Sequence, residues 1–239
     1  MMRLLVSVRD LTEAEQVAEA GVDFIDLKDP AAGALGALPL GLSRRIVQAL
    51  RSRPPAGDGA PSTVISATIG DLSSSALRSV LAMVDAVADT GVDHVKVGID
   101  GGPGAAALLE ALAGSRASVV PVLLADEGIA VDLVTQALAL NHFPALMVDT
   151  AHKRSGSLLD RLPYLELVRF VSTVQRHRGT QPCLVGLAGA LRLSELPELV
   201  ALAPDFAGFR SAVCDGDRAG ALDPARLQTL KAAARALPS

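Results

Sequence analysis

Short apolar runs and longer stretches of helical spacing alternate along this chain. Each run holds a few mainly apolar residues, which is the length of a buried strand. The runs lie at Leu4–Val8, Phe24–Lys28, Val64–Ile69, His94–Ile99, Val119–Ala125, Ala145–Thr150, Cys183–Ala188 and Phe206–Ser211. The stretches between them are rich in Ala and Leu at the spacing of amphipathic helices. Strands that alternate with helices predict a parallel sheet covered by helices.

This order of elements predicts one (β/α)8 TIM barrel that extends over the whole chain, residues 1–239. The main alternative is a doubly wound open sheet, but no glycine-rich dinucleotide fingerprint follows the first run. Residues 51–62 are rich in Pro and Gly and fall between a predicted helix and the third strand. We expect them to form a surface loop on the N-terminal face of the barrel, and not a domain boundary.

Composition supports a large apolar core and limits the kinds of partner. Half of the residues are hydrophobic, and the mean hydropathy is +0.38. The formal net charge is −4 and no long basic run occurs, so nucleic acid is not an expected partner. No apolar stretch is suited to span a membrane, and the chain begins directly with a strand-like run. We therefore expect no membrane partner, no signal peptide and a cytoplasmic location.

The residues that commonly bind metals show no organised pattern. Cys183 and Cys214 form neither a metal-binding pair nor a disulfide framework, which fits a reducing compartment. No spacing of His, Cys and carboxylate residues predicts a metal site. We expect the protein to use no metal and no other cofactor.

Charged residues interrupt three of the apolar runs. Asp26 and Lys28 share one face of the second run, Lys96 lies on the polar face of the fourth, and Asp149 on that of the sixth. Lys153 follows the sixth run in a loop. If the apolar faces pack against helices, the polar faces point into the barrel, where alternate strands contribute to common layers. We expect these five side chains to converge at the C-terminal mouth.

Such a cluster is suited to carbonyl chemistry. Burial and neighbouring cations lower the pKa of a lysine, which leaves some of the amine neutral and able to form a Schiff base. A second lysine can transfer protons, and carboxylates can orient the amines. Ser7 and Thr68 are expected to line the same mouth. The alternative is a purely structural set of ion pairs, which is disfavoured because desolvating each ion costs several kcal/mol.

Glycines follow the last two predicted strands, at positions where a backbone can approach a ligand closely. They are Gly186 and Gly189 after the seventh strand and Gly208 in the eighth. In TIM barrels the loops after these strands often bind phosphate through backbone N–H groups. Arg210 and Ser211 are expected to add contacts to the phosphate. The alternative is that the glycines only permit tight turns.

Five segments of this chain resemble the (5-formylfuran-3-yl)methyl phosphate synthases, also called 4-(hydroxymethyl)-2-furancarboxaldehyde-phosphate synthases. The segments are LLVSV, FIDLKDPAAGALGA, VISATIGD, HVKVGI and MVDTAHKRSGSLLD. The resemblance runs from Leu4 to about Ala212. Its most specific part is the pattern D-x-K-[DN]-P-x-x-G-x-L-G, which here extends from Asp26 to Gly36.

The resemblance implies a lyase that makes the furan precursor of methanofuran or methylofuran, in one-carbon metabolism, from two molecules of glyceraldehyde 3-phosphate. It implies that Lys28 forms the Schiff base and that Lys96 accepts a proton. By the same match, Asp26, Asp149 and Lys153 belong to the active site. Formation of an aromatic ring drives the reaction, so no redox cofactor is implied.

Two other functions fit the same predicted barrel. One is a different Schiff-base aldolase or isomerase of phosphosugars, and the other is a non-catalytic barrel that binds a sugar phosphate. In each case the expected partner is a small triose phosphate or a related sugar phosphate. We also expect a homo-oligomer, since barrels with apolar helix faces often associate.

Overall fold

The computed structural model describes residues 2–53, 63–151, 156–177 and 182–237. Most of the predicted surface loop at residues 51–62 and the predicted site residue Lys153 lie outside the described residues. None of the helices within these ranges combines the length and the apolar character that a membrane span requires.

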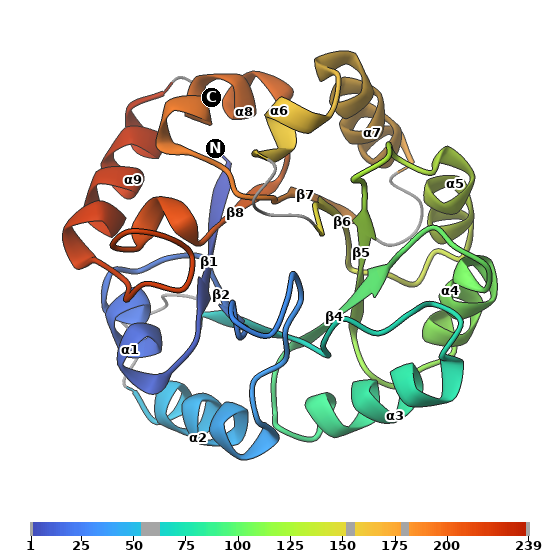
Figure 1. Cartoon of the computed structure of the whole chain (residues 1–239), viewed down its shortest axis with the longest axis horizontal. Coiled ribbons are helices and arrows are strands. Elements are labelled where there is room, and N and C mark those ends of the chain that lie inside the picture. Colours follow the sequence, from blue (N-terminus) through green and yellow to red (C-terminus); the bar gives the residue numbers. More distant parts are fainter. Residues whose placement is uncertain (1, 54–62, 152–155, 178–181, 238–239) are drawn as a thin grey trace.

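Eight parallel strands close into a barrel in sequence order, and helices surround it (Figure 1). The strands are β1 (Arg3–Val8), β2 (Phe24–Leu27), β3 (Val64–Thr68), β4 (His94–Ile99), β5 (Val119–Leu124), β6 (Ala145–Asp149), β7 (Leu184–Leu187) and β8 (Phe206–Phe209). The predicted TIM barrel is therefore confirmed. The last strand is shorter than expected, because the chain turns after Phe209 into the short 3-10 helix η2 (Ser211–Val213).

Nine α-helices of the described residues follow or connect the strands, and the ends of α1 show how local sequence sets a boundary. They are α1 (Leu11–Glu19), α2 (Leu40–Arg51), α3 (Leu77–Ala88), α4 (Ala105–Ala113), α5 (Val131–Ala139), α6 (Leu158–Arg161), α7 (Tyr164–Arg176), α8 (Leu196–Leu202) and α9 (Pro224–Ala236), with the 3-10 helix η1 (Leu193–Glu195) before α8. Asp10 caps α1 by accepting a hydrogen bond from the Glu13 N–H. Gly21, at a φ of 65°, ends the same helix.

The strands separate two apolar regions. Residues such as Ile25 and Leu27 pack outward against the helices in the larger core. A smaller cluster fills the barrel interior and includes Leu5, Val120, Val122, Met147 and Phe206. The interior is thus apolar over much of its depth, and its charged residues lie toward the C-terminal mouth.

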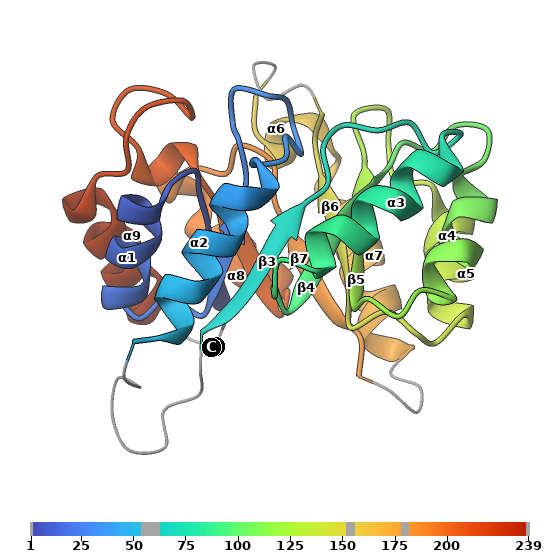
Figure 2. The same ribbon diagram turned by 90° about the horizontal axis from the view of Figure 1, so that it is seen from below.

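The loop between β2 and α2 folds over part of this mouth. Leu35, at the centre of the loop, is 1% exposed and belongs to the interior cluster. The carboxylate of Asp71 holds the loop by accepting hydrogen bonds from the N–H groups of Ala34 and Leu35, at 2.8 and 2.7 Å. A Cβ atom on Gly33 would lie 1.8 Å from that carboxylate. Figure 2 shows this loop rising on the same face as the loop between β8 and α9.

Gly186 of β7 lies at a tight point of the barrel interior. A Cβ atom there would lie 2.3 Å from Cζ of Phe206 and 2.9 Å from Cγ of Met147. Phe206 in turn packs against Phe24, with 5.2 Å between the ring centroids. Glycine at this position therefore makes room for the aromatic pair.

We expect Gly186→Ala to lower the free energy of unfolding by about 1–3 kcal/mol, because the added methyl group overpacks the interior. Urea denaturation measures this change. Gly41→Ala is the matched control, since a Cβ atom at this position of α2 meets nothing within 4 Å. The control should be neutral or slightly stabilising. An unchanged stability of Gly186→Ala would contradict the packing role.

Candidate active site

A pocket opens at the C-terminal mouth of the barrel. Its walls combine interior side chains of β1, β2, β4 and β6 with the segments after β7 and β8. Of the predicted site residues, it is lined by Ser7, Lys28, Lys96, Asp149, Gly189, Gly208, Arg210 and Ser211. The pocket therefore brings most of them together.

The Asp26 carboxylate joins four strands just below the pocket. It is fully buried and accepts hydrogen bonds from the hydroxyl groups of Ser7 and Ser66, at 3.0 and 2.7 Å. The strand register places these three residues side by side across β1, β2 and β3. Lys96 reaches the same carboxylate from β4, with 3.1 Å between Nζ and Oδ2. The buried ammonium and carboxylate thus compensate each other's loss of hydration.

A second ion pair links opposite sides of the mouth. Nζ of Lys28, just beyond β2, lies 3.9 Å from Oδ2 of Asp149 at the end of β6. The other carboxylate oxygen accepts a hydrogen bond from the Thr150 N–H at 2.7 Å. Both side chains are less than a tenth exposed and both line the pocket. The parity of the strands therefore predicted correctly that the two lysines and two aspartates converge.

The loop after β7 has backbone geometry suited to an anion. Gly189 and Ala190 have φ values of 122° and 47°, so two successive residues adopt the left-handed side of the backbone map. Within the described ranges, the N–H groups of these residues have no acceptor. Both residues line the pocket, and successive backbone N–H groups in such turns form anion-binding concavities.

Two predicted site residues have other roles in the structure. Gly186 does not line the pocket, and its lack of a side chain serves the packing of β7 against Phe206. The hydroxyl group of Thr68 donates a hydrogen bond to the Gly36 carbonyl at 2.8 Å, so it fastens the loop after β2. Strand position alone does not distinguish a pocket wall from a packing contact, so substrate contacts of these two residues stay a prediction.

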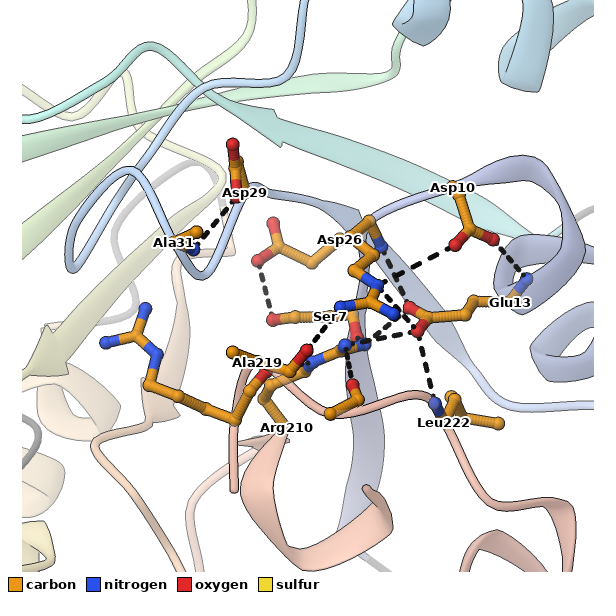
Figure 3. Close-up of polar contacts among 12 residues, drawn as sticks. Ser7, Asp10, Glu13, Asp26, Asp29, Ala31, Arg210, Ala219 and Leu222 are labelled. Carbon is orange, nitrogen blue, oxygen red and sulfur yellow. Dashed lines mark hydrogen bonds and ion pairs between the residues drawn. The ribbon is translucent and has the colours of Figure 1, made fainter. Parts of the chain in front are cut away.

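Arg210 lies at the pocket, but its guanidinium group is already committed to the protein. Nε and the two Nη atoms donate to the carbonyl groups of Ser7, Arg218 and Gly220 and to both carboxylate oxygens of Glu13. These five bonds use all five N–H groups that an arginine has. Figure 3 shows the side chain lying among Ser7, Glu13 and Leu222. The geometry does not support the predicted Arg210 contact with phosphate, because a new acceptor would have to displace one of these bonds.

Glu13 of α1 is the buried counter-ion of Arg210. It also accepts hydrogen bonds from the N–H groups of Arg9 and Leu222, so it connects α1, β1 and the loop before α9. Burial opposes the ionisation of Glu13, but its hydrogen bonds from Arg210 and Arg9 outweigh burial and lower the pKa of the carboxyl group. Sequence reasoning did not single out Glu13.

Sequence reasoning also missed Arg218, which lines the pocket from the loop after η2. Its Nη2 donates a hydrogen bond to the Gly33 carbonyl at 2.7 Å. The signal that indicates it is the polar, glycine-containing segment Asp215–Gly220, which follows the eighth strand and so lies on the catalytic face.

The two cysteines are buried, and the described residues contain no cluster of metal-binding types. Both thiols are buried, and burial raises the pKa of Cys183 and of Cys214 to about 11, so neither is a reactive thiolate at neutral pH. Within the described ranges, no three side chains of His, Cys, Asp or Glu lie close enough together to hold a metal ion. The amines of Lys28 and Lys96 belong to the residues that line the pocket.

Comparison with known proteins gives one consistent family. The model of the family described as 4-HFC-P synthase matches residues 4–231. A Methylorubrum extorquens protein, provisionally named a (5-formylfuran-3-yl)methyl phosphate synthase, is 39% identical over 237 residues, which cover 99% of this chain and 93% of the relative. An Archaeoglobus fulgidus protein of the same name is 32% identical, with 91% of this chain and 92% of the relative covered.

Solved structures share the fold at low sequence identity. Phosphoribosyl anthranilate isomerase from Thermus thermophilus superposes with a TM-score of 0.69 at 18% identity, and 99% of this chain and 100% of that chain are covered. A 3-hexulose-6-phosphate synthase gives a TM-score of 0.56 at 19% identity, with 97% and 99% covered. These likenesses support the barrel architecture.

We expect Asp26→Asn to lower the free energy of unfolding by about 3–5 kcal/mol, because it leaves the Lys96 ammonium buried without a counter-charge. Urea denaturation at pH 7 measures the loss. Adding Lys96→Met to the same chain should restore part of the stability, since both charges are then gone. A double variant that is no more stable than Asp26→Asn would show that the two side chains are not coupled.

We expect Glu13→Gln to lower the free energy of unfolding by about 3–5 kcal/mol at pH 7, because Arg210 loses its counter-charge. A carboxyl group with a lowered pKa in the folded state stabilises the protein fully above its ordinary value of 4.5. That contribution is lost as the pH falls through the lowered pKa. The difference in free energy of unfolding between the parent and Glu13→Gln should therefore decrease below about pH 4.5, as urea titrations at several pH values would measure. Glu15→Gln on the same helix is the control, and a gap that stays constant down to acid pH would contradict the linkage.

Proposed function

Since this chain belongs to the (5-formylfuran-3-yl)methyl phosphate synthase family, we propose that it condenses two molecules of glyceraldehyde 3-phosphate into (5-formylfuran-3-yl)methyl phosphate. Relatives that carry a synthase name indicate an enzyme. The proposed reaction is that of a carbon–oxygen lyase that releases phosphate and water and uses no redox cofactor. Its product would serve as the furan precursor of methanofuran or methylofuran.

The observation that carries the proposal is the position of Lys28. Its amine is nearly buried, lines the pocket and lies beside Asp149. A lysine held in a partly desolvated pocket next to other charged groups can act as a nucleophile toward a carbonyl group. The second pocket lysine, Lys96, comes from β4 and has its own carboxylate partner, Asp26.

The proposed reaction begins when one triose phosphate isomerises to its ketone form. The Lys28 amine attacks the ketone carbonyl, and water leaves to give an iminium. The second triose phosphate loses the proton at C2 and the phosphate at C3, which leaves an enol whose terminal carbon is a nucleophile. This carbon forms a carbon–carbon bond to the iminium carbon, which gives the branched carbon skeleton of the product. The free hydroxyl group of the first triose then closes the ring on the ketone of the second, and loss of the Lys28 amine and of a water molecule gives the aromatic furan aldehyde.

Lys96 and Asp26 are proposed to transfer the proton. The two side chains form an ion pair at 3.1 Å, and Ser7 and Ser66 hold the carboxylate in place. A general base must lie within hydrogen-bonding reach of its proton, and Lys96 lines the same pocket as Lys28. We propose that Asp149 orients the Lys28 amine, and that Lys153 also belongs to the site.

The segments after β7 and β8 are proposed to bind the phosphate that stays on the product. Gly189 and Ala190 bring to the pocket N–H groups that have no acceptor among the described residues, and Gly208 and Ser211 also line it. The residues near the reacting amines and those near the phosphate lie in one continuous pocket. This arrangement supports a substrate with a carbonyl group at one end and a phosphate at the other.

We expect the parent protein to convert glyceraldehyde 3-phosphate into a product with the ultraviolet absorbance of a conjugated furan aldehyde. Lys28→Arg should abolish the product, because a guanidinium does not form the iminium under these conditions. Borohydride added during turnover should attach substrate carbon to Lys28 of the parent, which mass spectrometry of peptides detects. Loss of activity on replacing Lys28 should be several orders of magnitude.

Lys231, which lies outside the proposed site, provides the control. The chain has four lysines, and Lys231 of α9 contacts the Ala20 carbonyl on the outside of the barrel. Lys231→Arg should retain both turnover and trapping. Activity that survives Lys28→Arg would exclude the Schiff-base route. A trapped adduct without furan product would instead indicate a different phosphosugar aldolase, and ligand binding with neither adduct nor turnover would indicate a non-catalytic barrel.

A further inference from the structure

The loop between η2 and α9 forms part of the pocket rim through Arg218. An isolated bridge pairs Cys214 with Leu222, and the Asp215 N–H donates to the Ala221 carbonyl at 2.9 Å. The turn between them is so tight that a Cβ atom on Gly220 would lie 1.8 Å from the Asp215 carbonyl oxygen. The loop is therefore a closed turn with defined backbone geometry.

Two arginines, one just after β1 and the other just after β8, hold this turn against the barrel. Arg210 donates to the carbonyl groups of Arg218 and Gly220, at 2.9 and 2.8 Å, and Arg9 donates to that of Ala219. Arg210 is itself held by Glu13 (Figure 3). The ion pair between Arg210 and Glu13 thus positions the backbone of Arg218, and this backbone fixes where the Arg218 side chain begins.

The Arg218 side chain crosses the mouth of the barrel and lines the pocket. It is half-buried, and Nη2 donates to the Gly33 carbonyl of the loop that follows Lys28. In the described part of the chain, this is its one hydrogen bond and no carboxylate lies within ion-pair distance. Burial lowers the pKa of Arg218 while the more distant Asp149 opposes the shift, and the group remains a cation at neutral pH.

We propose that Arg218 binds a phosphate group of the substrate in this pocket, together with the backbone N–H groups of Gly189 and Ala190. This inference rests on the proposed function and deepens it by naming the cation of the phosphate site. It also gives Glu13 and Arg210 a role as positioning residues, which act through the backbone of the loop and do not touch the substrate.

The chemistry favours Arg218 over Arg210 for this task. The five N–H groups of Arg210 are all used, and its charge is balanced by Glu13 in direct contact. Arg218 keeps most of its N–H groups for a further acceptor, in a fork that matches two phosphate oxygens. Its bond to Gly33 would also couple the bound phosphate to the loop that begins at Lys28, so the carbonyl end of the substrate is oriented as well.

The test uses inorganic phosphate as the probe and the full chain as the protein. Isothermal titration calorimetry in a chloride buffer compares the parent with Arg218→Gln, which removes the charge, and with Arg218→Lys, which keeps the charge but loses the fork. We expect Arg218→Gln to weaken phosphate binding about tenfold to a hundredfold, as charge-assisted hydrogen bonds are lost. The phosphate affinity of Arg218→Lys should lie between those of the parent and of Arg218→Gln. If Arg218→Gln does not fold, Arg218→Lys takes its place in the comparison with the parent.

Arg45→Gln is the matched control, because Arg45 is exposed on α2 and the substitution changes the net charge equally. It should bind phosphate as the parent does. Phosphate binding by Arg218→Gln that equals the parent's, or a parent that binds no phosphate, would overturn the proposal.

Turnover separates this proposal from the proposed function. In steady-state assays with glyceraldehyde 3-phosphate, Arg218→Gln should raise KM more than it lowers kcat. If the parent binds phosphate through Arg218 but forms no furan, the proposed function is refuted and the proposed phosphate site is still supported. Furan formation by Arg218→Gln with the KM of the parent would refute the role of Arg218 and leave the function.

Discussion

The centre of this barrel depends on the interactions that neutralise the buried carboxylate of Asp26. A charge without contact to water is stable only if its neighbours supply hydrogen bonds and an opposite charge. Ser7, Ser66 and Lys96 supply both, and each comes from a different strand. The same contacts that neutralise Asp26 therefore hold Lys96 in the barrel interior, where it lines the pocket. The proposed proton transfer uses a pair that the fold must keep intact for its own stability.

Two loops from distant parts of the chain complete the mouth above this layer. Asp71 holds the loop after β2, with Leu35 buried over the barrel interior, while Glu13 and Arg210 hold the loop after β8. In both cases a carboxylate on one element accepts several N–H groups of another. Arg218 then bridges the two loops through the Gly33 carbonyl. The pocket is thus bounded by loops that side-chain hydrogen bonds hold in place, which suits the proposed condensation of two substrate molecules.

Much of the fold and of the reactive centre could be predicted from periodicity alone. Successive side chains of a strand point to opposite faces, which separates Ile25 and Leu27 from Asp26 and Lys28. The structure places these two pairs on opposite faces. Position along a strand does not say whether a residue meets a ligand or a neighbouring side chain. Gly186 and Thr68 lie on predicted interior positions, yet one makes room for an aromatic ring and the other fastens a loop.

The sequence by itself determined the order of strands and helices, the barrel and the inward direction of the charged strand residues, because these follow from short-range periodicity and from the closure of eight similar units. Only the tertiary structure decided which cation is available to a ligand. Arg210 and Glu13 are 197 residues apart in the chain, and their pairing removes Arg210 from the set of free cations. Arg218 reaches the pocket through a loop whose course depends on that pairing. Such long-range partners leave no periodic trace, since the energy of a buried ion pair depends on distance in space and burial and not on spacing in the sequence.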